Sequence, residues 1–134
     1  MVDAARSKTA LLWLSWREVL MIHKTLRGIG SESLLVDKGE SGYHNEFLPD
    51  GRIVYPGEGL QGNQQPTEGN RVLLEAHAES RPMQVFAREG PNRWRDLGRY
   101  RVERVEYEWL QPEQRYIYKF TLAPELSTDQ GSKL

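Results

Sequence analysis

YRVERVEYEW, residues 100–109, and RYIYKFTL, residues 115–122, alternate apolar and polar side chains over eight or more positions. This period of two is typical of strands that bury one face and expose the other to water. Gln111 and Pro112 lie between the two segments and predict a turn. The sequence therefore predicts two long, half-buried antiparallel strands joined by that turn.

The other elements are predicted from helical spacing and from glycine and proline. Residues 8–27 carry apolar side chains at steps of three or four, and Gly28 and Gly30 end that pattern. We expect one α+β domain over residues 1–123 and a flexible polar tail at 124–134. The predicted elements are a helix at 8–27, a linker or short irregular strand at 31–42, a strand at 52–55, a glycine-rich loop at 57–69, a helix at 70–79 with Asn70 as its N-cap, a strand at 82–88 and a turn at 89–92.

Composition and charge narrow the class of protein. The chain has 134 residues, is 38% apolar and 28% charged, carries a net charge of −1 and contains no cysteine. Disulfides, zinc–thiolate sites and cysteine nucleophiles are therefore excluded, and the near-neutral charge argues against coating DNA through bulk charge. The most apolar run, residues 10–16, is too short to span a membrane, and no secretory signal is visible. We expect a cytoplasmic protein with no membrane partner.

Gly57, Gly59 and Gly62 form a G-x-G-x-x-G after a predicted strand, which is the pattern of a dinucleotide site. Such a site requires a helix that opens at the third glycine, because its amide groups face the pyrophosphate. Pro66 and Gly69 make a helix unfavourable here. We therefore interpret the segment as a glycine-rich turn, whose backbone a ligand can approach closely.

His44 and Glu46 form an H-x-E, the spacing at which zinc deaminases place a metal ligand and a proton-shuttling glutamate. The cysteine ligands of that chemistry are absent, and the three histidines show no zinc spacing. No serine lies in a recognisable nucleophile turn. We expect no metal, no cofactor and no catalytic residue.

Tyr43 and Tyr55 lie twelve positions apart, each near a glycine, with the acid Glu46 between them. Two aromatic faces and a carboxylate are what a nucleobase pocket requires. Stacking is worth about 1–3 kcal/mol per base, and a carboxylate accepts a hydrogen bond from the exocyclic amine of cytosine. The alternative is that both tyrosines pack at the edge of the core, and spacing alone leaves it open.

The order of these residues resembles the SRA domain, also called YDG, which reads modified cytosine in DNA. The resemblance covers about residues 40–110. This part of the chain is similar to compact bacterial versions of the domain, which often lie beside an HNH nuclease in modification-dependent restriction enzymes. It implies a PUA-like fold, in which a curved, barrel-like, mostly antiparallel sheet carries flanking helices. The matching segments are Ser41-Gly-Tyr43, Glu46, Tyr55-Pro-Gly57-Glu-Gly59, Gly62-Asn63, Asn70-Arg-Val-Leu73, Pro82-Met-Gln-Val85 and Asp96-Leu-Gly-Arg-Tyr-Arg-Val102.

The resemblance also implies base flipping, in which the modified cytosine leaves the duplex. The base would lie between Tyr43 and Tyr55, and Glu46 would accept a hydrogen bond from its N4. Glu58 stands where it could hydrogen-bond a hydroxymethyl group, so we expect 5-hydroxymethylcytosine to bind at least as well as 5-methylcytosine. The predicted base pocket consists of Ser41, Gly42, Tyr43, His44, Glu46, Tyr55, Gly57 and Glu58.

Arginines and the polar loop are the predicted DNA contacts. Phosphate contacts set affinity and salt dependence rather than base identity. A solvated arginine-rich surface and a mobile polar loop are the alternatives. The candidates for phosphate contact are Arg71, Arg88, Arg93, Arg95, Arg99 and Arg101, and those that could fill the gap left by the base or read its neighbours are Gln61, Asn63, Gln64 and Gln65.

We therefore expect a non-catalytic module that binds double-stranded DNA containing modified cytosine. No nuclease motif is visible, so an HNH-type or other nuclease would lie on another segment or on a partner. Three alternatives remain open: a PUA-like RNA-binding module, a small enzyme that uses Glu46 and His44 as acid and base, and a protein-interaction domain in which the tyrosines are structural.

Overall fold

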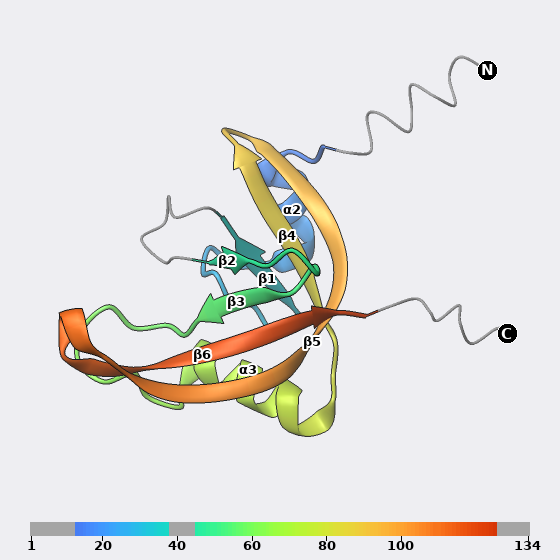
Figure 1. The fold of residues 1–134 in the computed structure, drawn as a ribbon. Coiled ribbons are helices and arrows are strands. Elements are labelled where there is room, and N and C mark those ends of the chain that lie inside the picture. Colours follow the sequence, from blue (N-terminus) through green and yellow to red (C-terminus); the bar gives the residue numbers. More distant parts are fainter. Residues whose placement is uncertain (1–12, 38–44, 126–134) are drawn as a thin grey trace, which may run out of the picture.

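The computed structural model describes residues 13–37 and 45–125, which form six strands, two α-helices and one short 3₁₀ helix (Figure 1). This arrangement confirms the α+β class predicted from the sequence. The elements are α2 (Trp16–His23), β1 (Ser33–Val36), β2 (Glu46–Phe47), β3 (Ile53–Pro56), α3 (Glu68–Glu79), β4 (Met83–Gly90), β5 (Arg93–Leu110), η1 (Gln111–Glu113) and β6 (Arg115–Pro124).

The six strands belong to one curved, open sheet in the order β1-β4-β5-β6-β3-β2. β1 and β4 run parallel and the other neighbours are antiparallel, which confirms the mostly antiparallel sheet that the SRA resemblance implies. Register shifts interrupt β4–β5 between Val85 and Phe86, and β5–β6 between Val102 and Arg104. Such bulges bend a strand, and Figure 1 shows β5 curving strongly along its length.

The β5–β6 hairpin is the strand pair predicted from the alternating segments. Its register runs from Tyr100 opposite Pro124 to Leu110 opposite Arg115, and η1 makes the turn. β5 begins earlier than predicted, because residues 93–99 pair with β4. Most side chains in that first part are exposed, so they do not alternate between core and water and gave no strand signal.

The helix predicted at 8–27 is shorter in the described part of the chain. Leu14 pairs with Trp94 in an antiparallel bridge, so the chain is extended just before the helix. Ser15 then caps α2, because its side chain accepts from the Glu18 N–H and the Glu18 carboxylate accepts from the Ser15 N–H. Lys24, at φ 67°, ends the helix. Apolar spacing alone did not separate the helix from the extended segment before it.

One further prediction is corrected at the start of α3. α3 begins at Glu68, and its N-cap is Thr67. The N-cap assignment of Asn70 was wrong because this side chain is buried and hydrogen-bonds to the loop before the helix. Within residues 31–42, which were predicted as a linker or short irregular strand, Ser33–Val36 form the short strand β1, and residues 38–42 lie outside the described ranges.

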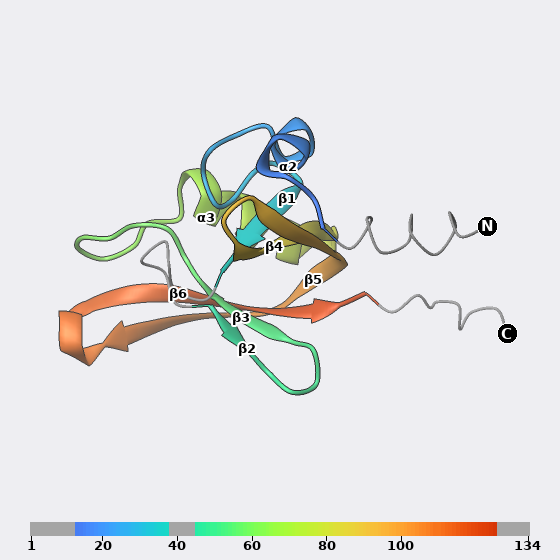
Figure 2. The ribbon, with the colours of Figure 1, turned by 90° about the horizontal axis from the view of Figure 1, so that it is seen from above.

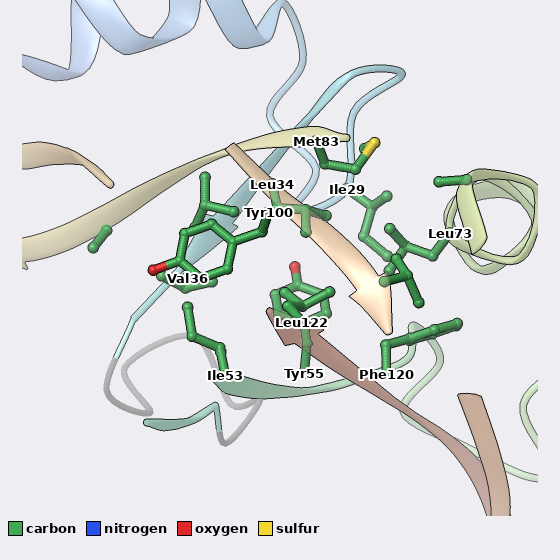
Figure 3. Packing of buried hydrophobic residues seen from close by; sticks show 14 residues of the cluster. Ile29, Leu34, Val36, Ile53, Tyr55, Leu73, Met83, Tyr100, Phe120 and Leu122 are labelled. Atoms are coloured by element: carbon green, nitrogen blue, oxygen red, sulfur yellow. The ribbon is translucent and has the colours of Figure 1, made fainter. Parts of the chain in front are cut away.

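The main hydrophobic core lies between the sheet and α3. Leu73 of α3 packs in the same cluster as Tyr55, Phe120 and Leu122, which project from β3 and β6 (Figure 3). A smaller cluster joins α2 to β4 and β5 and contains Val19, Phe86 and Trp94. Figure 2 shows both helices on one side of the β5–β6 hairpin. Full burial of each large apolar side chain contributes about 1.5–3 kcal/mol, so these clusters fix the strands that surround the site.

Candidate nucleic-acid interface

A cavity of about 910 Å³ opens between the loop after β3, the end of β1 and the β4–β5 turn. Its wall combines aromatic rings with uncharged polar groups and a few charged side chains. Ligand pockets typically combine aromatic and apolar side chains with a few polar groups that orient the ligand. The residues that line the cavity include Trp16, Arg27, Asp37, Asn45, Tyr55, Glu58, Gln61, Asn63, Gln64, Gln65, Asn70, Arg88 and Trp94.

Tyr55 forms part of this wall and part of the core. Its side chain is 6% exposed, and its hydroxyl donates a hydrogen bond of 3.1 Å to the Leu35 carbonyl. The ring lies opposite Phe120 in the β3–β6 register, close to Leu122 (Figure 3). A Cβ added at Gly28 would lie 2.9 Å from the Tyr55 hydroxyl, so the chain packs tightly against this ring. The ring is therefore held rigidly where it borders the cavity.

Glu46 lies on the other side of the strand pair. It is exposed on β2 opposite Val54, whereas the buried positions of β3 are Ile53 and Tyr55. Neighbouring positions on a strand point to opposite faces. Glu46 borders a second hollow, which it shares with Arg52 and other charged side chains. The structure thus does not bring Glu46 and Tyr55 to one cavity.

Asn45 and Asp37 line the cavity instead, and sequence reasoning missed both. Asn45 is 6% exposed, and its Oδ1 accepts a hydrogen bond of 2.9 Å from the Asp37 N–H. Asn45 Nδ2 is buried and has no hydrogen-bond partner among the described residues. The one available signal was strand alternation, which places residue 45 opposite to Glu46.

Gln64 was predicted to contact DNA, but in the structure its side chain holds the glycine-rich loop in place. Its side chain is 3% exposed, and Nε2 donates to the carbonyls of Gly57 at 2.8 Å and Gly59 at 3.1 Å. Its Oε1 accepts from the Tyr118 N–H at 2.8 Å. Gln64 therefore fastens the glycine-rich loop to β6, although it also borders the cavity.

The other polar residues of the loop remain on its surface. Gln61, Asn63 and Gln65 are exposed and line the cavity. Asn63 Oδ1 accepts from the Tyr116 N–H at 2.8 Å, which ties it to β6 as well. Gln61 and Gln65 are thus the loop amides best placed to meet a ligand from outside.

Gly57 and Asn70 hold the loop from its two ends. Asn70 Oδ1 accepts from the Glu58 N–H at 2.7 Å, and Nδ2 donates to the carbonyls of Glu58 and Gln65 at 3.0 and 2.9 Å. A Cβ added at Gly57 would lie 2.5 Å from Gln64 Oε1 and 2.7 Å from Asn70 Oδ1. Side-chain hydrogen bonds therefore tie the glycine-rich segment at both ends.

Glu58 lines the cavity with its carboxylate held by two partners. It accepts from the Gly69 N–H at 3.2 Å and pairs with Arg27 Nη2 at 3.0 Å. Arg27 also pairs with Glu68, and hydrogen bonds to Glu68 and Glu58 raise the pKa of the guanidinium. A ligand group that approached Glu58 would compete with these contacts.

His23 anchors the chain that carries Arg27. Its Nε2 lies 2.6 Å from the Arg27 carbonyl, and its Nδ1 lies 2.6 Å from Ser33 Oγ. Because a carbonyl can only accept, Nε2 carries the proton, and Nδ1 accepts from the serine hydroxyl in the neutral ring. Burial lowers the pKa of His23, which favours this neutral form, while the bond to the Arg27 carbonyl raises it by less.

The predicted phosphate-contact arginines have varied surroundings. Arg88 lines the cavity, and the Arg93 guanidinium lies 4.4 Å from the centre of the Trp13 ring. Arg71 pairs with Glu75 on α3. Arg95 pairs with Glu89, and Arg99 and Arg101 both pair with Glu125. Phosphate contact by Arg71, Arg95, Arg99 or Arg101 would therefore exchange a carboxylate partner for a phosphate.

Several predicted pocket residues cannot be placed. Ser41, Gly42, Tyr43 and His44 lie outside the described residues. Within those residues, no group of three or more His, Asp and Glu side chains could hold a metal ion. None of the described helices is long and apolar enough to cross a membrane.

The fold is shared by SRA domains of known structure. The SRA domain of SUVH5, bound to fully hydroxymethylated CG DNA, superimposes with a TM-score of 0.67 at 23% identity, over 79% of each chain. The modification-dependent restriction endonuclease TagI gives 0.69 at 20% identity, over 84% of this chain and 47% of its own. The sulfur-binding and SRA domains of ScoMcrA, complexed with phosphorothioated DNA, give 0.62 at 21% identity, over 84% and 38%. The class of fold is therefore that of an SRA domain.

The sequence itself narrows the assignment further. Residues 25–132 match the family described as the ScoMcrA-like SRA domain. This match spans well over half of the chain, so the chain belongs to that family. No curated protein matches the sequence closely enough to add a second comparison. The resemblance predicted from the motif order is thus confirmed, and it extends beyond residues 40–110 on both sides.

Proposed function

We propose that this chain binds double-stranded DNA that contains a modified cytosine and receives the everted base in the cavity beside Tyr55. The observation that carries the proposal is this cavity in a chain of the SRA family, bordered by a rigid aromatic ring and by polar amides. SRA domains of the same fold are known bound to methylated and hydroxymethylated CG DNA. Eversion costs a few kcal/mol, which stacking and polar contacts in such a pocket offset.

The structure describes only one of the two rings of the predicted pocket. Tyr55 borders the cavity and supplies one wall for the base. The second wall stays a prediction from the family resemblance, which assigns it to Tyr43 together with Ser41, Gly42 and His44. Glu46 faces the second hollow, so its predicted contact with N4 requires a different course of β2 when DNA is bound.

The C5 substituent of the base would lie near Glu58 in the pocket that the resemblance implies. The Glu58 carboxylate already accepts hydrogen bonds from Gly69 and Arg27, so a hydroxymethyl group could donate a hydrogen bond to an acceptor that is held in place. A methyl group there would meet a charged surface without a compensating contact. We therefore keep the expectation that 5-hydroxymethylcytosine binds at least as well as 5-methylcytosine.

The module would act by recognition alone. In this proposal the arginines and the loop amides Gln61 and Gln65 hold the duplex, and a nuclease on another segment or on a partner cuts it. The restriction endonuclease TagI shares the fold over 47% of its length, which supports a recognition module within a restriction system.

Fluorescence anisotropy at one fixed salt concentration tests the proposal. The probes are duplexes identical except for a single cytosine, 5-methylcytosine or 5-hydroxymethylcytosine, together with an RNA duplex of the same sequence. We expect tighter binding to the modified DNA than to the unmodified DNA or the RNA. Equal affinity for all DNA duplexes, or a preference for RNA, would refute the proposed function.

Variants of Tyr55 connect the binding to the cavity. Tyr55→Leu removes the ring and should weaken binding to the modified duplex by the equivalent of about 1–3 kcal/mol. Tyr55→Phe keeps the ring, loses the hydroxyl that bonds to the Leu35 carbonyl, and should bind nearly as the wild type does. Circular dichroism melting of both variants shows whether a loss of binding reflects unfolding, as the protein-interaction alternative requires.

A further inference from the structure

Three large aromatic side chains are exposed at the end of the β5–β6 hairpin. Tyr107, Trp109 and Tyr116 are between 40% and 48% exposed. The Tyr107 and Tyr116 rings stack with 5.2 Å between centroids, and the Trp109 ring meets Tyr116 edge-on at 5.1 Å. Contiguous exposed apolar surface, unlike scattered single residues, is typical of contact sites. We call this surface the aromatic tip.

The aromatic tip is the outer end of a row of rings that begins in the core. The Tyr118 ring centroid lies 4.7 Å from that of Tyr107 and 5.7 Å from that of Phe120, which is fully buried. Rings directly opposite each other across the strand pair share one face, so the tip lies on the same face of the sheet as Phe120. The tip therefore continues the buried face of the hairpin to a place where the described chain leaves it exposed.

The aromatic tip also contacts the loop that borders the cavity. The Tyr107 hydroxyl donates to the Gln64 carbonyl at 2.9 Å, and the Tyr116 N–H donates to Asn63 Oδ1 at 2.8 Å. Gln64 and Asn63 both line the cavity on the other side of the loop. The exposed surface of the hairpin is therefore continuous with the rim of the cavity.

The charges around the aromatic tip are balanced. Residues 104–119 contain three acidic and three basic side chains, and each acid has a basic partner. This end of the hairpin therefore neither repels nor attracts the phosphates of a duplex as a whole, and its rings are what it offers to a partner. The pairs are Arg104–Glu106 at 4.0 Å, Lys119–Glu108 at 3.3 Å and Arg115–Glu113 at 2.6 Å.

We propose that the aromatic tip is a second DNA contact, which packs against the sugars and bases of the duplex to one side of the everted base. This inference rests on the proposed function, in which the base enters the cavity beside Tyr55. Tyr55 lies opposite Phe120, and Tyr116 lies four positions further along β6, a distance of about 13 Å in a strand. A duplex rises about 3.4 Å per base pair, so the tip meets it about four base pairs from the modified cytosine.

The position of the tip favours DNA over a protein partner. A duplex that delivers one base to the cavity continues past the rim, and the tip extends that rim. Aromatic rings bind DNA without sequence preference, because every base has a π-face. Figure 1 shows β5 curving from the β4–β5 turn, which carries the phosphate-contact candidate Arg93, to the hairpin end. The two ends of one strand would thus supply charge and rings to the same duplex.

A double variant, Trp109→Thr with Tyr116→Thr, tests the inference in anisotropy titrations. Threonine suits a strand, and the backbone bond from residue 116 to Asn63 is kept. The affinity for the modified duplex should fall about tenfold, which corresponds to about 1.4 kcal/mol. Because the tip lies away from the modified base, the affinity for the unmodified duplex should fall by the same factor, and the preference should stay as in the wild type.

Duplex length and salt give two further readouts. Probes are shortened from about ten to about two base pairs on one side of the modified cytosine, for each side in turn, so that one series ends before the tip. On that side the wild type should lose about tenfold more affinity than the double variant, which has already lost the contact. The slope of log affinity against log salt should be equal in both proteins, because no phosphate contact is removed.

Two matched variants control for folding and for the loss of exposed apolar surface. Trp109→Phe keeps an aromatic ring and should bind nearly as the wild type does. Met21→Gln removes an exposed apolar side chain on α2 that does not line the cavity, and it should leave every affinity unchanged. Melting temperatures show that each variant is folded.

The outcomes separate this inference from the function on which it rests. A folded double variant that binds every duplex as the wild type does overturns the inference and leaves the surface to a protein partner, while the proposed function stands. A loss confined to the modified duplex also overturns it, because the rings would then act on the base pocket. If wild-type protein binds modified and unmodified duplexes equally, the proposed function fails and the inference fails with it.

Discussion

Replacing Gln64 with methionine tests whether this residue is a structural tie or a DNA contact. The side chain makes three hydrogen bonds to backbone groups, and methionine has a similar length but replaces none of them. Each bond contributes about 1 kcal/mol net, so their loss amounts to about 3 kcal/mol. A domain of this size loses roughly 4 °C of melting temperature per kcal/mol, so Gln64→Met should melt about 12 °C lower.

Gln65→Ala is the matched control, since it removes a neighbouring glutamine that is exposed. Its one hydrogen bond within the loop, to the Asn63 carbonyl at 3.2 Å, is also exposed, and surface changes of this kind stay within about 0.5 kcal/mol. The expected pattern is a large thermal shift with Gln64→Met and a shift of about 2 °C or less with Gln65→Ala. Differential scanning calorimetry measures both. A Gln64→Met protein that melts as the wild type does would refute the structural interpretation and restore Gln64 as a surface residue available to DNA.

The remaining predictions concern the groups around the loop. Burial lowers the pKa of His23, so the unfolded chain takes up a proton first as the pH falls; stability should be full above about pH 6.5 and decline below it, and His23→Gln should flatten that slope in melting curves from pH 7.5 to 5.5. A Cβ at Gly57 would lie 2.5 Å from a buried amide oxygen, so Gly57→Ala should lose about 1–3 kcal/mol in urea unfolding, whereas Gly90→Ala, which meets nothing within 4 Å, should change far less. The Arg27 ion pairs are largely exposed, so Arg27→Gln should cost less than about 1 kcal/mol, but release of Glu58 should alter the ratio of hydroxymethylcytosine to methylcytosine affinity in anisotropy titrations.

The fold was predictable where one side of a strand is buried along its length. β6 and the second part of β5 alternate between core and water, so their period of two was visible in residues 100–122. The first part of β5 was missed because its side chains are mostly exposed, although its backbone pairs with β4. For β1 the sequence predicted only a linker or a short irregular strand. Ser33–Val36 is almost wholly buried and too short to show a period of two in hydrophobicity.

The site was predictable from the order of its residues but not from their directions. The motif order predicted that Tyr55 and the glycine-rich loop share one site, and both line one cavity. It could not show which of Glu46 and Asn45 faces the cavity, because that depends on the register in which β2 pairs with β3. A shift of one residue exchanges the two faces of a strand. The sequence therefore predicted Glu46 at the cavity wall, and the structure places its neighbour Asn45 there.

The signature of the loop has a physical explanation that differs from ligand contact. Gly57 and Asn70 match the segments that resemble other SRA domains, and both serve to hold the loop against α3 and β6. Gln64, between them, completes the same network. In the proposed function, a loop that is already ordered lowers the cost of receiving a base, because ordering a free loop would add to the cost of eversion. A residue can therefore belong to the signature by holding the loop, without touching DNA.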